Sequence, residues 1–198
     1  MTRALTVARL LDLLRDTLQL ELIGDGGGLD RVISVNEVSS PGLVLAGFVE
    51  RFPAKRMQVF GETEITYLQS LSEARRREVL ETFFSFDVPC AVVTKRMDVP
   101  DDLRTIAAAH GVPVLRSSLK TTEFYRRVKP ALDEEFAPST TLHGSLADVY
   151  GVGLLFVGRS GIGKSECVLD LVERGHRLVA DDIVIATRRG NDVIIGRG

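Results

Sequence analysis

An eight-residue glycine-rich segment, G-R-S-G-I-G-K-S, constrains this chain more than any other feature of its sequence. It fits the pattern G-x-x-x-x-G-K-[ST], in which glycines let backbone N–H groups turn inward around phosphate oxygens. In this pattern the lysine reaches the terminal phosphates, the following hydroxyl completes a Mg²⁺ shell, and the next helix points its positive end at the same anion. The segment predicts a phosphate-binding loop for a nucleoside triphosphate, made of Gly158, Arg159, Ser160, Gly161, Ile162, Gly163, Lys164 and Ser165.

The residues on either side of this loop follow the order that such a loop requires. The apolar run Leu154–Val157 is typical of a buried strand. Between Glu166 and Arg174 the apolar residues fall at helical spacing, and Gly175 follows where a helix C-terminus favours a left-handed residue. Strand, glycine loop and helix therefore agree with the motif, which by itself does not name the reaction.

Composition and charge exclude several classes of partner. The 198 residues are 44% hydrophobic and 26% charged, as in ordinary globular proteins, and their net charge of −2 predicts neither nucleic acid nor an anionic membrane as a partner. No apolar stretch approaches the roughly 20 residues of a membrane span, and charged residues interrupt the N-terminal leucines, unlike a secretory signal. Cys90 and Cys167 lie in apolar surroundings, so we expect buried free thiols in the reducing cytoplasm, with a disulfide between them as the alternative.

Residues 1–136 are predicted to form an α/β domain. A helical stripe from Val7 to Leu18 precedes a strand-like Leu20–Ile23, and the glycine run after it is interpreted as a surface turn, because Leu29 occupies the third glycine position of a dinucleotide fingerprint. Strand and helix patterns then alternate, which favours a parallel sheet. The expected elements are strands at 57–60, 90–94 and 112–115 and helices at 71–84, 101–110 and 122–136.

Residues 137–198 are predicted to be the first part of a phosphate-transfer domain. Pro138–Thr141 is interpreted as a linker or domain edge, and the following residues as a strand and turn that lead into the phosphate-loop strand. The chain then ends soon after a strand-like Asp192–Ile195, although a phosphate-transfer domain normally needs more sheet. We therefore expect the domain to be incomplete.

Three polar side chains near the loop are candidates for chemistry. The apolar segment Arg177–Ala180 ends in Asp181 and Asp182, at a place where enzymes with such loops hold Mg²⁺ or take a nucleophile's proton. If the strand continued through both acids, its period of two would turn only one of them toward the phosphates; the alternative is a pair of exposed turn carboxylates. His143, in a strand expected beside the phosphate-loop strand, is placed to orient a carboxylate or contact a phosphate, or else is structural.

Several stretches together resemble the bacterial HPr kinase/phosphorylase family over essentially the whole chain. In the second part these are Thr141–Gly144, Asp148–Gly153, the phosphate loop and Arg174–Asp182. In the first part they are Ser40–Phe48 and Pro113–Ser117. The resemblance implies an α/β N-terminal domain followed by a catalytic domain similar in fold to phosphoenolpyruvate carboxykinase, and a cytoplasmic homohexamer assembled through the catalytic domain.

The resemblance also implies an activity and roles for individual residues. Members use ATP and Mg²⁺ to phosphorylate a serine of the phosphocarrier protein HPr, and they reverse the reaction with inorganic phosphate, which yields pyrophosphate. His143 and Lys164 match catalytic positions, the loop 158–165 matches the ATP site, and Ser165 matches a Mg²⁺ ligand. One of Asp181 and Asp182 matches the acid that accepts the serine proton; Asp182 is favoured slightly.

The family's remaining Mg²⁺-binding glutamate and a catalytic arginine are expected beyond Gly198, so this chain alone is expected to be inactive or weakly active. Two other functions remain as alternatives. One is a kinase with the same loop that acts on a small molecule without HPr. The other is a non-catalytic regulatory or oligomerising piece, whose first domain binds a partner.

Overall fold

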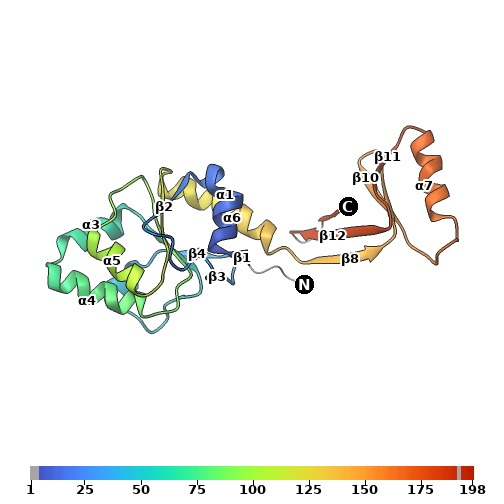
Figure 1. Ribbon diagram of the computed structural model, residues 1–198. Helices are drawn as coiled ribbons and strands as arrows, with labels where there is room; N and C mark the ends of the chain where they lie inside the picture. Colours follow the sequence, from blue (N-terminus) through green and yellow to red (C-terminus); the bar gives the residue numbers. More distant parts are fainter. Residues whose placement is uncertain (1–4, 191–192) are drawn as a thin grey trace. The chain divides into compact units, whose positions relative to one another are not determined.

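The computed structural model describes residues 5–190 and 193–198, and contacts among them divide the chain after Phe136 into two compact units (Figure 1). Each unit has its own sheet system and its own helices. No helix among the described residues is long and apolar enough to cross a lipid bilayer.

The first unit is built on a mostly parallel five-stranded sheet. The strands lie in the order β2-β7-β6-β5-β4; β4 to β7 run parallel to one another, and β2 pairs antiparallel with β7. The alternating pattern thus predicted the parallel part, but not the reversed edge strand. The bounds are Leu20–Ile23 for β2, Val38–Ser39 for β4, Met57–Phe60 for β5, Ala91–Val93 for β6 and Val114–Ser117 for β7.

Helices cover both faces of this sheet. On one face α2 (Gly42–Leu45), α3 (Glu62–Ser70), α4 (Glu73–Phe84) and α5 (Asp101–Ala109) enclose one apolar cluster. On the other, α1 (Val7–Leu18) and α6 (Thr121–Glu135) enclose a second cluster (Figure 1). Met57 and Val59 of β5 enter one cluster and Phe60 enters the other, and all four residues of the strand are buried, as in a strand covered on both faces.

Most elements predicted for this unit are confirmed within a few residues, but α3 was missed. Its nine residues lie before the predicted helix at 71–84, which begins at Glu73. The backbone of Leu71 is extended between the two helices, and the Ser72 hydroxyl caps the second by accepting a hydrogen bond from the Arg75 N–H. Two short strands, β1 (Leu5–Thr6) and β3 (Val32–Ile33), pair with each other and were not foreseen.

The second unit contains two antiparallel three-stranded sheets and one helix. Their orders are β10-β9-β11 and β13-β12-β8, and α7 (Lys164–Glu173) packs against β9 and β11. The strands are β8 (Ser139–His143), β9 (Ser145–Val149), β10 (Val152–Phe156), β11 (Arg177–Ala180), β12 (Ile183–Arg189) and β13 (Val193–Arg197).

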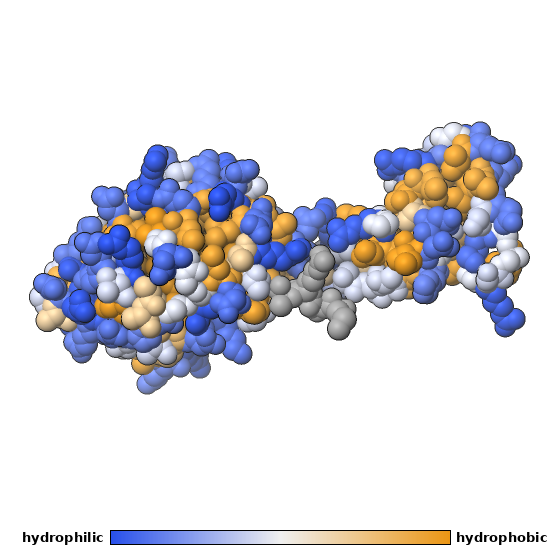
Figure 2. Space-filling model, in the orientation of Figure 1, coloured by the Kyte–Doolittle hydropathy of each residue, from blue (hydrophilic) through white to orange (hydrophobic). Residues whose placement is uncertain are grey.

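Two expectations for this unit were wrong. Residues 139–141 lie at the edge of the unit, one of the two alternatives for this segment, but they are not a linker: they belong to β8, where they pair with β12. The phosphate-loop strand β10 is an edge strand of its sheet, and its Leu154 and Leu155 are exposed and not buried as predicted. Figure 2 shows such apolar side chains on the surface of this unit. The strand predicted at 192–195 is confirmed at residues 193–195, within β13, and Asp192 lies outside the described residues.

The two cysteines differ in environment, and both are free. Cys90 is fully buried in the cluster beneath α1 and α6, and burial raises the pKa of its thiol to about 12. Cys167 lies exposed on α7, so the expectation of two buried thiols was wrong for this residue.

Gly28 provides a test of the packing of the first unit. Its φ is +78°, and a Cβ at this position would overlap the carbonyl oxygen of Gly111. Gly24 has φ +101° but open space around it. Both Gly→Ala changes place alanine in a left-handed conformation, at about 1–2 kcal/mol. We expect Gly28→Ala to lower the free energy of unfolding by about 1–3 kcal/mol more than Gly24→Ala, because of the added overlap.

This difference is measured by denaturant unfolding, followed through a probe in the first unit. Equal destabilisation by the two changes would show that the turn moves freely away from Gly111.

Thiol labelling tests the assignment of the two cysteines. At pH 8 we expect a thiolate-specific reagent to modify Cys167 rapidly and Cys90 only after unfolding, since the Cys90 thiol stays protonated and inaccessible. Mass spectrometry of timed samples gives both rates, and Cys167→Ser is the control that removes the fast phase. Rapid labelling of Cys90 in native protein would contradict the buried position.

Candidate functional site

The phosphate-loop sequence lies between β10 and the N-terminus of α7, as predicted. Gly161 has φ +77° and Gly163 has φ +98°, in the left-handed region where a residue with a Cβ is strained. The first backbone hydrogen bond of α7 joins the Cys167 N–H to the Gly163 carbonyl, so the preceding N–H groups of the helix have no helical acceptor. This is the local geometry with which a helix N-terminus binds an anion.

The far end of α7 also matches its predicted cap. Gly175 has φ +92° and donates its N–H to the Val172 carbonyl, while the His176 N–H donates to the Leu171 carbonyl. These two bonds satisfy the last helical carbonyls in the pattern expected for a glycine that terminates a helix. The sequence therefore defined both ends of this helix.

Lys164 is folded over the loop that precedes it. Its ammonium group donates to the carbonyl oxygens of Gly158 at 3.1 Å and Arg159 at 3.0 Å. These bonds hold the positive charge at the concave side of the loop, where it complements a phosphate. The Arg159 side chain contributes nothing comparable: it is exposed and does not line the adjoining cavity.

A cavity of about 360 Å³ opens over the loop and collects most of the predicted residues. His143 and Asp182 lie in its wall together with Lys164 and Ser165. Arg159, Ile162 and Asp181 are outside it. The lining is His143, Gly144, Ser145, Gly158, Ser160, Gly161, Gly163, Lys164, Ser165, Glu166 and Asp182.

His143 reaches this cavity by a route that differs from the predicted one. It ends β8, which pairs with β12 and not with the phosphate-loop strand β10. The next residue, Gly144, passes so close to the end of β10 that an added Cβ would overlap the Phe156 carbonyl oxygen. The missing side chain at Gly144 thus lets the end of β8 lie against the end of β10.

The two acids after β11 are separated by a break in the strand. β11 ends at Ala180, and Asp182 has φ +66°, so the alternation of an extended strand does not decide their directions. Asp182 lines the cavity, and among the described residues its carboxylate has no hydrogen-bond or ion-pair partner. The Asp181 carboxylate instead accepts a hydrogen bond of 2.5 Å from the Ser145 hydroxyl.

Three cavity residues were not assigned to the site from the sequence. Gly144 and Ser145 directly follow His143, but nothing in their residue types signals a contact with β10 or with Asp181. Glu166 was explained by the helix dipole alone, and it also faces the cavity. The sequence did contain a signal for Glu166, because it directly follows Lys164 and Ser165 of the phosphate loop.

The first unit has a cavity of its own, of about 470 Å³, where its parallel strands end. Its carboxylates are already matched: Lys95 pairs with Glu62 and lowers the pKa of that carboxyl by hydrogen bonding and by its charge, while Glu64 accepts hydrogen bonds from the Gly61 N–H and the Ser40 hydroxyl. These internal pairs leave no carboxylate of this cavity without a partner.

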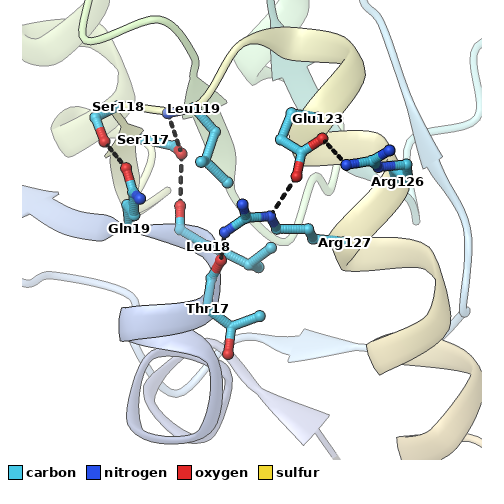
Figure 3. Close-up of polar contacts among 9 residues, drawn as sticks. All are labelled: Thr17, Leu18, Gln19, Ser117, Ser118, Leu119, Glu123, Arg126 and Arg127. Carbon is cyan, nitrogen blue, oxygen red and sulfur yellow. Dashed lines mark hydrogen bonds and ion pairs between the residues drawn. The ribbon is translucent and has the colours of Figure 1, made fainter.

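Side-chain bonds also anchor the loop after β7 (Figure 3). The Ser117 hydroxyl donates to the Leu18 carbonyl and accepts from the Leu119 N–H. Arg127 and Arg126 both bind Glu123, and their hydrogen bonds hold the pKa of that carboxyl below its ordinary value. The Arg127 guanidinium also donates to the Thr17 carbonyl at 3.0 Å, which fixes the N-terminal part of α6 to the end of α1.

Comparisons with known proteins agree with the two-unit division of the structure. Residues 5–132 match the family model described as HPr Serine kinase N terminus, and residues 134–198 match that of the HPr Serine kinase C-terminal domain. HPr kinase/phosphorylase from Bacillus cereus (strain B4264) is 43% identical over 178 residues, which are 90% of this chain and 58% of that protein. The protein of the same name from Shouchella clausii (strain KSM-K16) is 43% identical over 92% of this chain and 59% of its own length.

A solved structure, that of the Hpr(Ser) kinase/phosphatase from Coxiella burnetii, is 38% identical over 29% of this chain and 37% of that chain, with a TM-score of 0.27. The chain thus spans slightly less than three fifths of the curated relatives that it matches. Two adjacent family regions cover nearly all of its residues, and the second of them contains the phosphate loop and the cavity above it. This chain belongs to the HPr kinase/phosphorylase family.

Proposed function

We propose that this chain takes part in the ATP-dependent phosphorylation of a serine in the phosphocarrier protein HPr and in its reversal by inorganic phosphate. The observation that carries the proposal is the cavity in which the phosphate loop, His143 and Asp182 meet. Transfer of a phosphoryl group to a hydroxyl requires a phosphate cradle, formed here by the loop 158–165 and the start of α7, and a carboxylate free to accept the proton of the hydroxyl. This cavity contains both. The family membership supports HPr as the acceptor.

The loop and the start of α7 bind the phosphates of ATP. The N–H groups at the helix N-terminus and the Lys164 ammonium supply positive charge on one side of the cavity. Pyrophosphate, the product of the reverse reaction, occupies the same cradle, because it presents the same pair of linked phosphates.

Mg²⁺ fits the donor set of this cavity. The Ser165 hydroxyl and a carboxylate lie in one wall, and Mg²⁺ prefers oxygen ligands and combines few protein oxygens with phosphates and water. Among the described residues no group of three or more histidine, cysteine or acidic side chains forms a cage that binds a metal alone. When bound, the ion neutralises charge that develops on the transferred phosphoryl group.

Asp182 accepts the proton of the HPr serine as its oxygen attacks the terminal phosphorus of ATP. In the reverse direction inorganic phosphate attacks phosphoserine, and Asp182 returns the proton to the departing serine oxygen. His143 lies in the same wall, where it contacts the phosphoryl group or orients the acid. Lys164 stays on the phosphates throughout and moves no proton.

The wider family properties belong to the same proposal. They are a catalytic domain similar in fold to phosphoenolpyruvate carboxykinase, a homohexamer and a cytoplasmic location. Neither nucleic acid nor membrane is proposed as a partner, since the net charge is −2 and no described helix crosses a bilayer. The relatives are longer than the matched region, and their remaining residues are expected to raise the rate of transfer.

Pyrophosphate binding tests the cradle without requiring catalysis. We expect pyrophosphate to shift the amide resonances of residues 158–166, and Lys164→Ala to weaken its binding at least about tenfold, because the ammonium no longer faces the phosphates. Titration followed by NMR gives the dissociation constant. Lys120→Ala, in the first unit, is the matched control and should leave it unchanged. Equal weakening by both changes would mean that binding reflects only overall charge.

Phosphate transfer tests the acceptor. With HPr, ATP and Mg²⁺ we expect slow formation of phosphoserine on HPr, detected by mass spectrometry. Asp182→Asn should lower the rate about 100-fold or more while leaving pyrophosphate binding intact, since it removes the proton acceptor but not the cradle. Transfer to a small molecule without HPr would support the alternative kinase. No phosphoserine at all, with normal pyrophosphate binding, would contradict transfer by this chain.

A further inference from the structure

Two adjacent carboxylates of the second unit differ in their surroundings. Asp182 faces the phosphate cavity without a partner among the described residues, whereas Asp181 is hydrogen-bonded to Ser145 and does not line the cavity. Because both residues follow the end of β11, their different directions come from the contacts of this turn and not from strand alternation.

Ser145 is well placed to impose this difference. Its side chain is 1% exposed, at the start of β9, and β9 is the central strand of the sheet β10-β9-β11. The bond of 2.5 Å to Asp181 is the one hydrogen bond recorded for its hydroxyl among the described residues. A buried hydroxyl without a partner is costly, so the bond stabilises one direction of the Asp181 side chain.

The backbone of the turn is held at the same point. The Asp181 carbonyl accepts a hydrogen bond from the Ile183 N–H at 2.8 Å, and the Asp182 carbonyl accepts one from the Gly144 N–H at 3.1 Å. With φ +66° at Asp182, these bonds turn its side chain toward the cavity while Asp181 stays on Ser145. The turn is thus fixed by side chain and backbone together.

The arrangement has an electrostatic consequence for a phosphate site. Two carboxylates directed into one cavity repel each other and repel the phosphates that Lys164 attracts. The bond to the neutral Ser145 hydroxyl in the cavity wall keeps the Asp181 carboxylate out of the lining, so that Asp182 and Glu166 are the acids that line the cavity.

We propose that Ser145 is a positioning residue, which holds Asp181 out of the lining of the phosphate cavity so that, of these two adjacent acids, Asp182 is the one presented to the serine of HPr. The proposal rests on the proposed function for the role of Asp182 in proton transfer. The division between the two acids itself does not depend on catalysis. We thus assign Ser145 and Asp181 a role in placing the Asp182 side chain, without contact between either residue and the substrate.

A double-mutant cycle on the phosphorylation of HPr tests the energetic link. We expect Ser145→Ala and Asp181→Ala each to lower kcat about tenfold, with KM for ATP within about twofold of its original value, because the cradle is intact and the acid is misplaced. The two changes together should cost little more than either alone, since both remove one hydrogen bond. Asp181→Asn, whose amide oxygen still accepts the bond, and Ser145→Thr, which keeps the hydroxyl, should retain most of the rate.

Ser139→Ala, an exposed serine on β8, is the matched control and should change neither kcat nor KM. Fully additive losses for Ser145→Ala and Asp181→Ala, or a loss in Asp181→Asn as large as in Asp182→Asn, would overturn the proposal.

A second measurement needs no turnover and separates failure of this proposal from failure of the proposed function. Mn²⁺–pyrophosphate bound at the loop broadens nearby side-chain carboxyl resonances in ¹³C-detected NMR, according to distance. In the original chain we expect stronger broadening for Asp182 than for Asp181, and in Ser145→Ala we expect the two to become similar, while the remaining spectrum confirms the fold. Equal broadening before the substitution, or a difference that survives it, would overturn the positioning role whether or not HPr is phosphorylated.

Discussion

The candidate site depends on one close approach, that of Gly144 to the carbonyl oxygen of Phe156. Gly144 joins β8 to β9, which belong to different sheets, and it lies against the last residue of the phosphate-loop strand. Without a Cβ it allows His143, at the end of one sheet, to share a cavity with a loop that extends from the other. Its N–H also binds the Asp182 carbonyl, so the same residue holds the acid.

Charge is distributed over the cavity in a way that suits phosphate chemistry. Positive groups, the Lys164 ammonium and the first N–H groups of α7, belong to the loop and helix. The acid that faces them comes from a turn after β11, on a separate element. Because the two sets have independent supports, loss of a carboxylate does not remove the cradle. The Asp181 carboxylate, hydrogen-bonded to Ser145, does not line the cavity.

The first unit shows how much of a fold can be predicted from patterns of residue types. The strand pattern at β5, the continuous apolar run at β6, the apolar stripe of α1 and the helix pattern of α6 were recognised from the sequence, and they form a sheet covered on both faces. The helix α3 was missed: its nine residues have a weak apolar pattern, and it starts after a glycine whose N–H is bonded by Glu64. The antiparallel direction of β2 depends on pairing with Ser117 and its neighbours, about 100 residues away along the chain.

The sequence by itself determined the phosphate loop, both ends of the helix after it, the alternating α/β first region and the family of the chain. These follow from local rules: glycines where φ is positive, apolar spacing within one element, and a helix N-terminus beside a lysine. Only the tertiary structure decided that His143 lines the cavity over the loop from another sheet, that Cys167 is exposed, and that Asp182 and not Asp181 lines this cavity. Those outcomes depend on contacts between residues such as Ser145 and Asp181, 36 positions apart, which no spacing along the chain encodes.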